Sequence, residues 1–439
     1  MIQLLMNSLS DAETASAEVC KVAIIGFGTV GSSVAKILSE RAPAGLRLTH
    51  ICNRTLARKQ QAEWLPTHVK WTEDINEVLA SDVDVVVEVI GGLAPAGDWV
   101  RSALNSGKSV VTANKQLIAH YGPELIALAR KQKRHLAFGA SVAGGIPVIS
   151  GLQEGLAGDE LFKIYGILNG TCNYILSQIE SAGIPFSTAL AEAQRLGFAE
   201  ADPTDDIDGL DARAKLAILA RVGLRSQTHP NDILCRSISS IEAVDFDYAK
   251  QLGCTIRQIS WAELEGSGEK APHLLASVQP ALVGLSSPLA RVQGAQNLVM
   301  STGRFGGETV FGGHGAGGNP TAVAIVSDIA GIAKAQQGMP FEFEMAATPR
   351  SVTADFTTRH YLRFTVKDRP GIIATLASIF SDCDINIDSV LQKPGYLKSS
   401  LPFVITLETC KASLVEKART LIASLDFLAQ PCVYLPILN

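Results

Sequence analysis

Three features are absent from the 439-residue chain, and each absence excludes a class of protein. No apolar run reaches the roughly 18 residues of a membrane span, and the N-terminus has neither the basic start nor the apolar core of a signal peptide. The eight cysteines are scattered without C-x-x-C spacing, which argues against a zinc site or a disulfide scaffold and fits a reducing cytoplasm. Positive charge is not in excess, since the net charge is −5, so nothing favours nucleic acid or an anionic membrane.

The composition is that of a compact α/β protein. Hydrophobic residues make up 47% of the chain, 38 residues are glycine, and the length suffices for two or three domains. We expect residues 1–19 to be a frayed tail. Small-molecule chemistry is the remaining broad class of function.

A glycine-rich motif connects the first predicted strand to the first predicted helix. Lys21–Ile25 is a short apolar strand, and helix-forming residues follow the motif as far as Glu40. In this context glycines bring backbone N–H groups against a pyrophosphate at the helix N-terminus. We therefore predict a Rossmann-type dinucleotide-binding domain over residues 20–148. Cofactor contacts are expected at Gly26, Phe27, Gly28, Thr29, Val30 and Gly31.

The second predicted strand bears on the choice of cofactor. Leu46–Cys52 ends in Asn53-Arg54, whereas NAD-preferring sites usually carry Asp or Glu there for the ribose hydroxyls. Arg54 is expected to pair with a 2′-phosphate instead. We therefore expect the domain to prefer NADP(H) and to accept NAD(H) as well. The alternative is that Arg54 is simply an exposed side chain without a role in cofactor binding.

Three further strands are predicted over 84–92, 110–115 and 136–141. Ligands of open α/β sheets gather at the carboxyl ends of the strands, so Asn114 and Lys115 fall where cofactor and substrate should meet. The alternative for Lys115 is a solvated side chain. The glycine-rich turn Val142–Pro147 follows. It either holds a hard cation through backbone oxygens or makes a tight domain crossover. The sequence alone favours the crossover.

The stretch Ala193–Lys215 concentrates acidic residues ahead of one lysine. This stretch is either a solvated loop or part of a functional site. Gly197 and Gly209 interrupt it at points where the backbone must turn. Asp211 and Lys215 are four residues apart and share one helix face, so they form either a surface ion pair or a positioned proton donor. The acids are Glu200, Asp202, Asp205, Asp206, Asp208 and Asp211.

Two other stretches of the middle region carry candidate residues. A strand is predicted at Phe162–Leu168, and Thr171 either caps the helix that follows or binds a substrate carboxylate. The glycine-rich stretch Phe311–Ala322 is expected to be a loop that approaches the cofactor or serves as a hinge. His314 has no carboxylate neighbour in sequence, so it receives no catalytic role.

Four stretches between residues 20 and 335 resemble the homoserine dehydrogenases and follow one another in the same order as in that family. They are the acidic stretch A-x-x-x-G-F-A-E-x-D-P-x-x-D-I-x-G-x-D-x-x-x-K, T-A-N-K (112–115), N-G-T-x-N-Y-I-L (169–176) and G-A-G-x-x-P-T-A (315–322). The chain departs from the family at Ala143, often glycine, and at Cys172, often Thr or Ser.

The resemblance implies reversible NAD(P)H-dependent reduction of L-aspartate 4-semialdehyde to L-homoserine in threonine, methionine and isoleucine biosynthesis. Lys215 is the implied proton donor and acceptor, with Lys115 as the second catalytic residue. The implied substrate-binding residues are Glu200, Asp211, Thr171 and Asp206. Further cofactor contacts are implied at Lys115, Gly197, Gly313 and Gly315. A sodium ion is implied on backbone oxygens of Gly139, Val142, Gly144 and Ile146. An attached aspartate kinase is not expected, because residues 1–19 leave no room for one.

We divide the remainder into a catalytic domain at 149–317, with 318–335 returning to the first domain, a polar linker at 340–358 and a C-terminal module at 359–439. The module has a predicted βαββαβ order and resembles an ACT domain. That resemblance implies an amino-acid effector, L-threonine, and a homodimer or homotetramer; the alternative is a module used only for dimerisation. The implied effector residues are Asp368, Gly371 and Asn386.

Two rival functions remain open on sequence. A semialdehyde dehydrogenase that forms a covalent intermediate needs a cysteine nucleophile, for which Cys172 is the candidate, although no histidine lies near it in sequence. A non-catalytic amino-acid sensor is the second rival, and the intact glycine motif, Lys115 and Lys215 argue against it.

Overall fold

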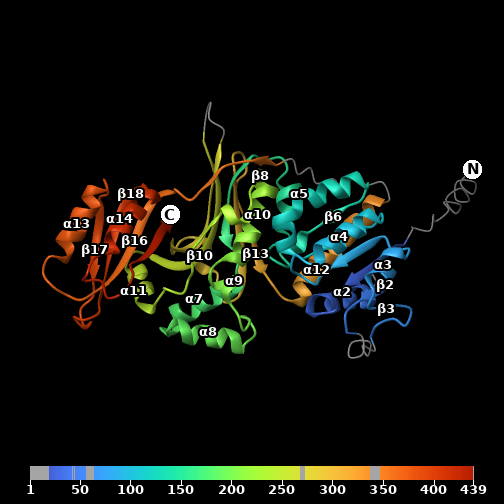
Figure 1. The fold of residues 1–439 in the computed structure, drawn as a ribbon, viewed down its shortest axis with the longest axis horizontal. Coiled ribbons are helices and arrows are strands. Elements are labelled where there is room, and N and C mark those ends of the chain that lie inside the picture. Colours follow the sequence, from blue (N-terminus) through green and yellow to red (C-terminus); the bar gives the residue numbers. More distant parts are fainter. Residues whose placement is uncertain are drawn as a thin grey trace, which may run out of the picture. The chain divides into compact units, whose positions relative to one another are not determined.

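The structure is a computed structural model that describes residues 19–41, 43, 45–55, 64–266, 272–336 and 347–438. The chain divides into two compact units, each described here by itself (Figure 1). Unit 1 comprises Met1–Ser141 and Gly317–Glu342, and unit 2 comprises Val142–Ala316 and Phe343–Asn439. Residues 1–18 of the expected tail and 340–346 of the expected linker lie outside the described residues. Across the described ranges, no helix is long and apolar enough to cross a membrane.

Unit 1 contains a six-stranded parallel sheet in the order β3-β2-β1-β4-β5-β6, so the predicted Rossmann architecture is confirmed. Its central strands are runs of Val and Ile buried on both faces, as parallel strands between helices must be. The order reverses between β1 and β4, where such sheets bind ligands. The strands are β1 (Cys20–Ile25), β2 (Leu46–Cys52), β3 (Lys70–Thr72), β4 (Val85–Glu88), β5 (Ser109–Thr112) and β6 (Leu136–Ala137).

Helices cover this sheet, and a late segment of the chain supplies one of them. α12 packs beside α2, and its apolar residues join the core of valines and isoleucines under β1 and β2. The predicted strand at 136–141 is shorter than expected, because Gly139–Ser141 form a 3₁₀ turn after β6. The helices are α2 (Thr29–Glu40), α3 (Ile75–Ala80), α4 (Ala96–Asn105), α5 (Lys115–Lys131) and α12 (Gly318–Gln336).

Unit 2 is built on a mixed 11-stranded sheet whose main path is β13-β12-β7-β10-β11-β19-β16-β18-β17. The predicted loop from residue 311 is partly wrong, because residues as far as His314 belong to β13 and pair with β12 in register. The catalytic part has strands β7 (Leu161–Ile167), β10 (Cys254–Glu265), β11 (His273–Gly284), β12 (Gln296–Gly303) and β13 (Gly307–His314). Its helices are α7 (Gly170–Ala182), α8 (Phe186–Arg195), α9 (Thr204–Ile207), α10 (Leu210–Leu224) and α11 (Ala243–Gln251).

The C-terminal module has the predicted βαββαβ order, which is confirmed. Its strand order β19-β16-β18-β17 is ferredoxin-like, and α13 and α14 contribute with the strands to one apolar core. β19 pairs in parallel with β11 at Leu282–Ile437 and Val283–Leu438, so the module's sheet continues the catalytic sheet. The elements are β16 (Thr357–Val366), α13 (Ile372–Asp382), β17 (Ile387–Gln392), β18 (Leu401–Lys411), α14 (Ala412–Ile422) and β19 (Val433–Leu438).

The described part of the expected linker is also attached to the catalytic part. β14 (Thr348–Pro349) pairs with β8 (Ser226–Gln227), and β15 (Val352–Thr353) pairs with β11. Because both pairings anchor the connection before β16 begins, it is a structured approach to the module.

Candidate active site

The glycine loop after β1 has the geometry of a phosphate cradle. A Cβ on Gly31 would lie 1.9 Å from the carbonyl oxygen of Gly26, and Gly26 itself has φ +102°, so both positions require glycine for the turn. Gly28 differs, because its ideal Cβ would meet no atom within 4 Å. No side chain caps α2, which begins at Thr29. The free space and the uncapped helix start suit a bound pyrophosphate.

The end of β2 braces this loop. The Asn53 side-chain oxygen accepts a hydrogen bond from the Phe27 N–H at 3.0 Å, and the Asn53 amide donates to the Thr55 carbonyl at 3.1 Å. Arg54 is exposed next to this brace. The strand end therefore fixes the loop with a neutral amide and leaves a guanidinium accessible beside it.

A buried polar network orders the carboxyl ends of β4 and β5. The fully buried Glu88 carboxylate accepts hydrogen bonds from the Ile90 and Gly91 N–H groups and, at 2.6 Å, from the Thr112 hydroxyl. The Thr112 hydroxyl oxygen also accepts from the Asn114 N–H at 2.9 Å.

Asn114 completes this network and starts α5. Its side-chain oxygen caps the helix at the Leu117 N–H, while its amide donates to the Gly92 carbonyl at 2.6 Å. Lys115, the first residue of α5, is half-buried and is held at the carboxyl edge of the sheet. The position predicted for Asn114 and Lys115 is the one that the structure shows.

In unit 2 the Lys215 ammonium is buried among oxygens. Its Nζ donates to Asp211 Oδ2 at 2.7 Å and to the Leu168 carbonyl at 2.9 Å. The two side chains of the pair are only 12% and 9% exposed, so the alternative of an ordinary surface ion pair is wrong. An ammonium has three N–H groups, so one remains for a ligand once these two bonds are made.

Asn169 links the lysine site to a second carboxylate. Its amide donates to Asp206 Oδ1 at 2.7 Å and to Asp211 Oδ2 at 2.9 Å, which keeps the two carboxylates close. Burial raises the pKa of the Asp206 carboxyl above its ordinary value, and the Asn169 hydrogen bond opposes that shift. The cluster thus offers a desolvated, anionic surface beside the Lys215 ammonium.

Cys172 lies against the same cluster, but its thiol is not activated. Its Sγ donates to the Asp206 carbonyl at 3.0 Å. Burial, reinforced by the nearby carboxylates, raises the pKa of the Cys172 thiol well above its ordinary value. A thiol that stays protonated is a poor nucleophile.

The remaining predicted substrate residues lie nearer the surface. Glu200 is exposed, and so is Gly197, a predicted cofactor contact, whose φ is +77°. Thr171 does not cap α7; Asn169 is the cap, since its side-chain oxygen accepts from the Cys172 N–H, whereas the Thr171 hydroxyl donates to the Phe198 carbonyl at 2.7 Å. Both residue types can cap helices, and the extended backbone at position 169 decides between them.

Two predicted cofactor glycines have neighbours inside unit 2. Gly313 lies in β13, and its ideal Cβ would be 3.4 Å from Ile146. Gly315 follows the strand, and its ideal Cβ would lie 2.1 Å from Asn297 Cγ. Position 315 therefore requires glycine for packing within the protein.

The predicted cation ligands divide between the two units. Gly139 lies in unit 1, where its N–H donates to Asp328 Oδ2 at 2.8 Å. Val142, Gly144 and Ile146 lie in a buried turn of unit 2, in which Ala143 has φ +56° and Gly144 has φ +51°. A left-handed alanine costs roughly 1–2 kcal/mol, so the turn is strained.

Two of the three predicted effector residues, Asp368 and Gly371, lie at the start of α13. A cavity of about 220 Å³ there is lined by Asp368, Arg369, Gly371 and Gln392 among others. Asn386 is not one of the lining residues, and its amide donates to Glu408 Oε2 at 3.2 Å.

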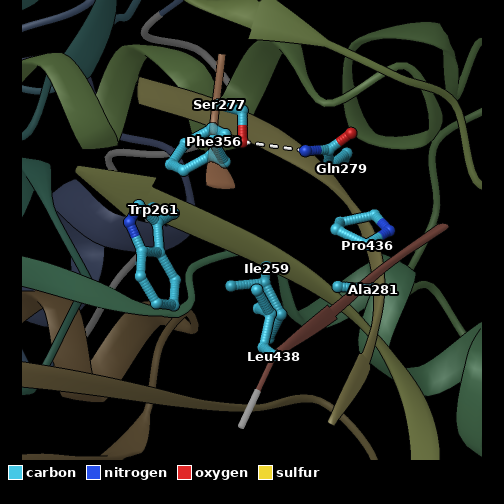
Figure 2. Close-up of a pocket in the computed structure, with 8 residues that line it drawn as sticks. All are labelled: Ile259, Trp261, Ser277, Gln279, Ala281, Phe356, Pro436 and Leu438. Atoms are coloured by element: carbon cyan, nitrogen blue, oxygen red, sulfur yellow. Dashed lines mark hydrogen bonds between the residues drawn. The ribbon is translucent and has the colours of Figure 1, made fainter. Parts of the chain in front are cut away.

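A second hollow, on the large sheet, is too small for a substrate. Its volume is about 20 Å³, and its lining residues include Trp261, Phe356 and Gln279. The Gln279 amide donates to the Ser277 hydroxyl (Figure 2). That volume suits about one water molecule, and the buried Gln279 Oε1 has no partner within the described part of the chain. We therefore exclude this hollow as the reaction site.

Local sequence patterns did not identify four members of these networks. Glu88 and Thr112 end buried strands, Leu168 acts through its backbone carbonyl, and Asn297 lies 129 residues from the carbonyl that it contacts. For Glu88 and Thr112 the sequence does contain a signal, because each is a polar residue at the end of an apolar strand. Leu168 and Asn297 have no such signal.

Comparison with known proteins matches three family models along the chain. Residues 26–139 match the NAD-binding domain of homoserine dehydrogenase, 147–330 match homoserine dehydrogenase, and 360–427 match the ACT domain. The homoserine dehydrogenase of Bacillus subtilis is 38% identical over 405 residues, covering 89% of this chain and 92% of that protein. That of Mycobacterium tuberculosis is 40% identical over 386 residues, covering 85% and 86%.

Solved structures agree with these matches. A homoserine dehydrogenase from Thiobacillus denitrificans superimposes with a TM-score of 0.87 at 33% identity, covering 96% of this chain and 99% of that one. A hyperthermophilic archaeal homoserine dehydrogenase in complex with NADPH superimposes with a TM-score of 0.61 at 27% identity, covering 73% and 98%.

Proposed function

The chain belongs to the homoserine dehydrogenase family, and from this premise we propose how its residues carry out the reaction. The enzyme interconverts L-aspartate 4-semialdehyde and L-homoserine with a nicotinamide cofactor. We place the reaction in threonine, methionine and isoleucine biosynthesis, in the cytoplasm. The single observation that carries the mechanism is the buried Lys215 ammonium between Asp211 and the Leu168 carbonyl.

In our proposal, Lys215 is the proton donor for aldehyde reduction and the acceptor in the reverse direction. Hydride transfer to the aldehyde carbon leaves negative charge on oxygen, and the remaining Lys215 N–H both stabilises and protonates that oxygen. The nicotinamide supplies the hydride when bound, so no protein nucleophile is needed. Lys115 assists as a second cation from the edge of the unit 1 sheet.

The acidic cluster is proposed to bind the substrate's α-ammonium and hydroxyl groups. Asp211 supplies a buried carboxylate and Asp206 a half-buried one, and Asn169 holds the two side by side. Glu200 and Thr171 are assigned supporting contacts, with Glu200 entering from the exposed part of the acidic stretch.

The cofactor is proposed to be NADP(H) in preference to NAD(H). The glycine loop leaves room for the pyrophosphate, and Arg54 is exposed at the end of β2, where a 2′-phosphate would approach. Contacts from Gly197, Gly313 and Gly315 stay part of the proposal, although Gly315 also has the packing reason described above.

A sodium ion is proposed on the carbonyls of Gly139, Val142, Gly144 and Ile146. The donors are neutral backbone oxygens, which suit a hard cation. The strained turn at Ala143 supports the assignment, because such backbone persists where the surroundings demand it. The ion's role is to order this turn. A higher melting temperature in NaCl than in choline chloride of equal ionic strength tests it.

The ACT domain is proposed to bind an amino-acid effector, L-threonine, at the cavity beside α13. Asp368 would meet the ammonium group, and the N–H groups of the helix start at Gly371 would meet the carboxylate. Two hydrogen bonds connect the ACT sheet to the acidic stretch. The Arg363 guanidinium of β16 donates to the Ser240 carbonyl at 3.1 Å. Two residues before Ser240, the Ile238 N–H donates to the carbonyl of Ile207, which follows Asp206 in the chain. These bonds give the effector a route to the acidic cluster.

A homodimer or homotetramer is proposed, since β17 is the edge strand of the ACT sheet and Val390 on it is 44% exposed. Light scattering at micromolar concentration tests this. A monomer would contradict it.

Initial rates of NADP⁺ and NAD⁺ reduction with L-homoserine, with and without L-threonine, test these assignments together. Faster turnover with NADP⁺ that falls with threonine supports the cofactor and effector proposals. Turnover unaffected by threonine leaves the enzyme and removes threonine as the effector. Absence of turnover with either cofactor contradicts the mechanism and favours the non-catalytic sensor.

A further inference from the structure

We propose that Asn297 is a positioning residue for Lys215, acting through the carbonyl of Leu168. The Asn297 amide fixes the oxygen to which the Lys215 ammonium donates, and so sets the direction of the remaining N–H. The inference rests on the role proposed for Lys215 above.

The geometry places both donors on one oxygen. Asn297 Nδ2 lies 3.0 Å and Lys215 Nζ lies 2.9 Å from the Leu168 carbonyl oxygen. A carbonyl oxygen only accepts hydrogen bonds, so the nitrogen of the Asn297 amide must face it. Asn297 is 2% exposed, so water does not compete for this bond.

The strand pairing explains why a side chain is needed at this point. The β7–β12 ladder ends with the pair Ile167–Leu298, and Leu168 is the first residue past β7. Asn297 neighbours that last pair on β12, and its amide replaces the next rung of the ladder. Without it the peptide of Leu168 would lose the bond that fixes its orientation.

The site carries an energetic cost that packing alone does not require. Asn297 Oδ1 is buried and has no hydrogen-bond partner among the residues that the structure describes. Such an acceptor costs roughly 1–3 kcal/mol, which an apolar side chain of similar size would avoid. The buried Asn173 Oδ1 likewise has no partner among the described residues, so the control residue is matched to Asn297 in this respect as well.

Gly315 accommodates this arrangement. A Cβ on residue 315 would lie 2.2 Å from Asn297 Nδ2, so an alanine there would displace the amide from Leu168. Gly315→Ala is therefore a second, independent way to disturb the same carbonyl.

The purified full-length enzyme tests the proposal through Asn297→Ala, the isosteric Asn297→Asp, and Asn173→Ala as the matched control. Asn173 is also fully buried, with its amide on the carbonyls of Val292 and Gly294, which Lys215 does not contact. In both Asn297 variants we expect kcat for homoserine oxidation to fall ten- to about a hundredfold, since a misplacement near 1 Å costs about a hundredfold. We expect KM for homoserine and NADP⁺ to change less than about threefold, because the proposed binding groups remain.

The outcomes separate a positioning role from a structural one. A positioning role lowers kcat in the Asn297 variants only and leaves KM nearly unchanged, whereas a merely structural role lowers thermal stability along with the rate. An unchanged kcat, or an equal fall in the Asn173 control at equal thermal stability, overturns the proposal. Gly315→Ala is expected to lower kcat likewise, because its Cβ would displace the Asn297 amide. If Gly315→Ala raises only KM for NADP⁺ and leaves kcat unchanged, the proposal is overturned.

Lys215→Ala, measured in parallel, distinguishes a failure of the catalytic role of Lys215 from a failure of the positioning role of Asn297. If that variant retains its rate, the role of Lys215 fails, whatever the Asn297 variants do. If it is inactive and Asn297→Ala is fully active, only the positioning role fails.

Discussion

The Lys215 ammonium and the Asp211 carboxylate lie 2.7 Å apart on neighbouring turns of α10, and less than an eighth of either side chain is exposed. Asp211 also accepts from Asn169, so one carboxylate serves both the lysine and the second acid, Asp206. A buried pair of this kind is tightly interdependent, because removing one partner takes away the opposite charge that offsets the desolvation of the other.

Lys215→Ala is expected to lower kcat a hundred- to about ten-thousandfold, the usual contribution of a general acid or base. Initial rates with saturating L-homoserine and NADP⁺ measure it. Lys36→Ala is the control, because Lys36 pairs with Glu40 at the same i,i+4 spacing but both side chains are more than half exposed. Turnover near the wild-type value in Lys215→Ala would remove the lysine from the chemistry.

Asp206→Asn is expected to raise KM for homoserine and to change the pH dependence of stability. Because burial raises the pKa of Asp206 above 3.8, its ionisation destabilises the folded wild type progressively as pH rises from 3.8 through the raised value. The asparagine variant escapes this loss, so its melting temperature relative to wild type should increase between acidic and neutral pH.

Asp202→Asn is the control of opposite sign for that experiment. Hydrogen bonds from the Thr204 hydroxyl and N–H lower the pKa of the exposed Asp202 carboxyl, so its ionisation favours the folded state at neutral pH. This variant should therefore lose a little stability above pH 3.8 and none below the lowered pKa. The same trend in both variants would contradict the assignment for Asp206.

Arg54→Ala is expected to raise KM for NADP⁺ about ten- to a hundredfold, since a charge-assisted hydrogen bond contributes roughly 1.5–3 kcal/mol. KM for NAD⁺, which has no 2′-phosphate, should change little. Arg47→Ala on the same strand is the control, because Arg47 is likewise exposed but lies away from the strand end. Equal effects on the two cofactors would show that Arg54 does not select between them.

The adjacent residues Ala143 and Gly144 should respond oppositely to exchange of alanine and glycine. Ala143→Gly removes a left-handed alanine at φ +56°, and we expect up to about 1 kcal/mol of stabilisation after the greater freedom of the unfolded chain is counted. Gly144→Ala should destabilise, because its Cβ would lie 2.6 Å from the Gly315 carbonyl oxygen. Denaturant midpoints at fixed sodium concentration measure both. Destabilisation by Ala143→Gly would show that the turn is not strained.

Cys172→Ala is expected to retain turnover within about an order of magnitude, because the buried, protonated thiol takes no part in hydride transfer. Iodoacetamide should alkylate Cys172 only after unfolding, which mass spectrometry detects. Abolished turnover in a folded Cys172→Ala variant would revive the covalent mechanism.

Local patterns in the sequence were sufficient wherever neighbours in the chain decide the structure. A glycine motif between strand and helix specified the phosphate cradle, because Gly26 and Gly31 meet each other across one turn. The four-residue spacing of Asp211 and Lys215 placed them on one helix face, and the alternating elements after residue 359 gave the ACT order.

Only the tertiary structure decided which polar groups meet. Asn297 and Leu168 are 129 residues apart, and their contact follows from the end of the β7–β12 ladder, which no local spacing encodes. The same holds for the pairing of β19 with β11, which continues the catalytic sheet into the ACT domain. Burial likewise separated Asp211, and in part Asp206, from the exposed Glu200, Asp202 and Asp205, because desolvation depends on what the rest of the chain packs against a carboxylate.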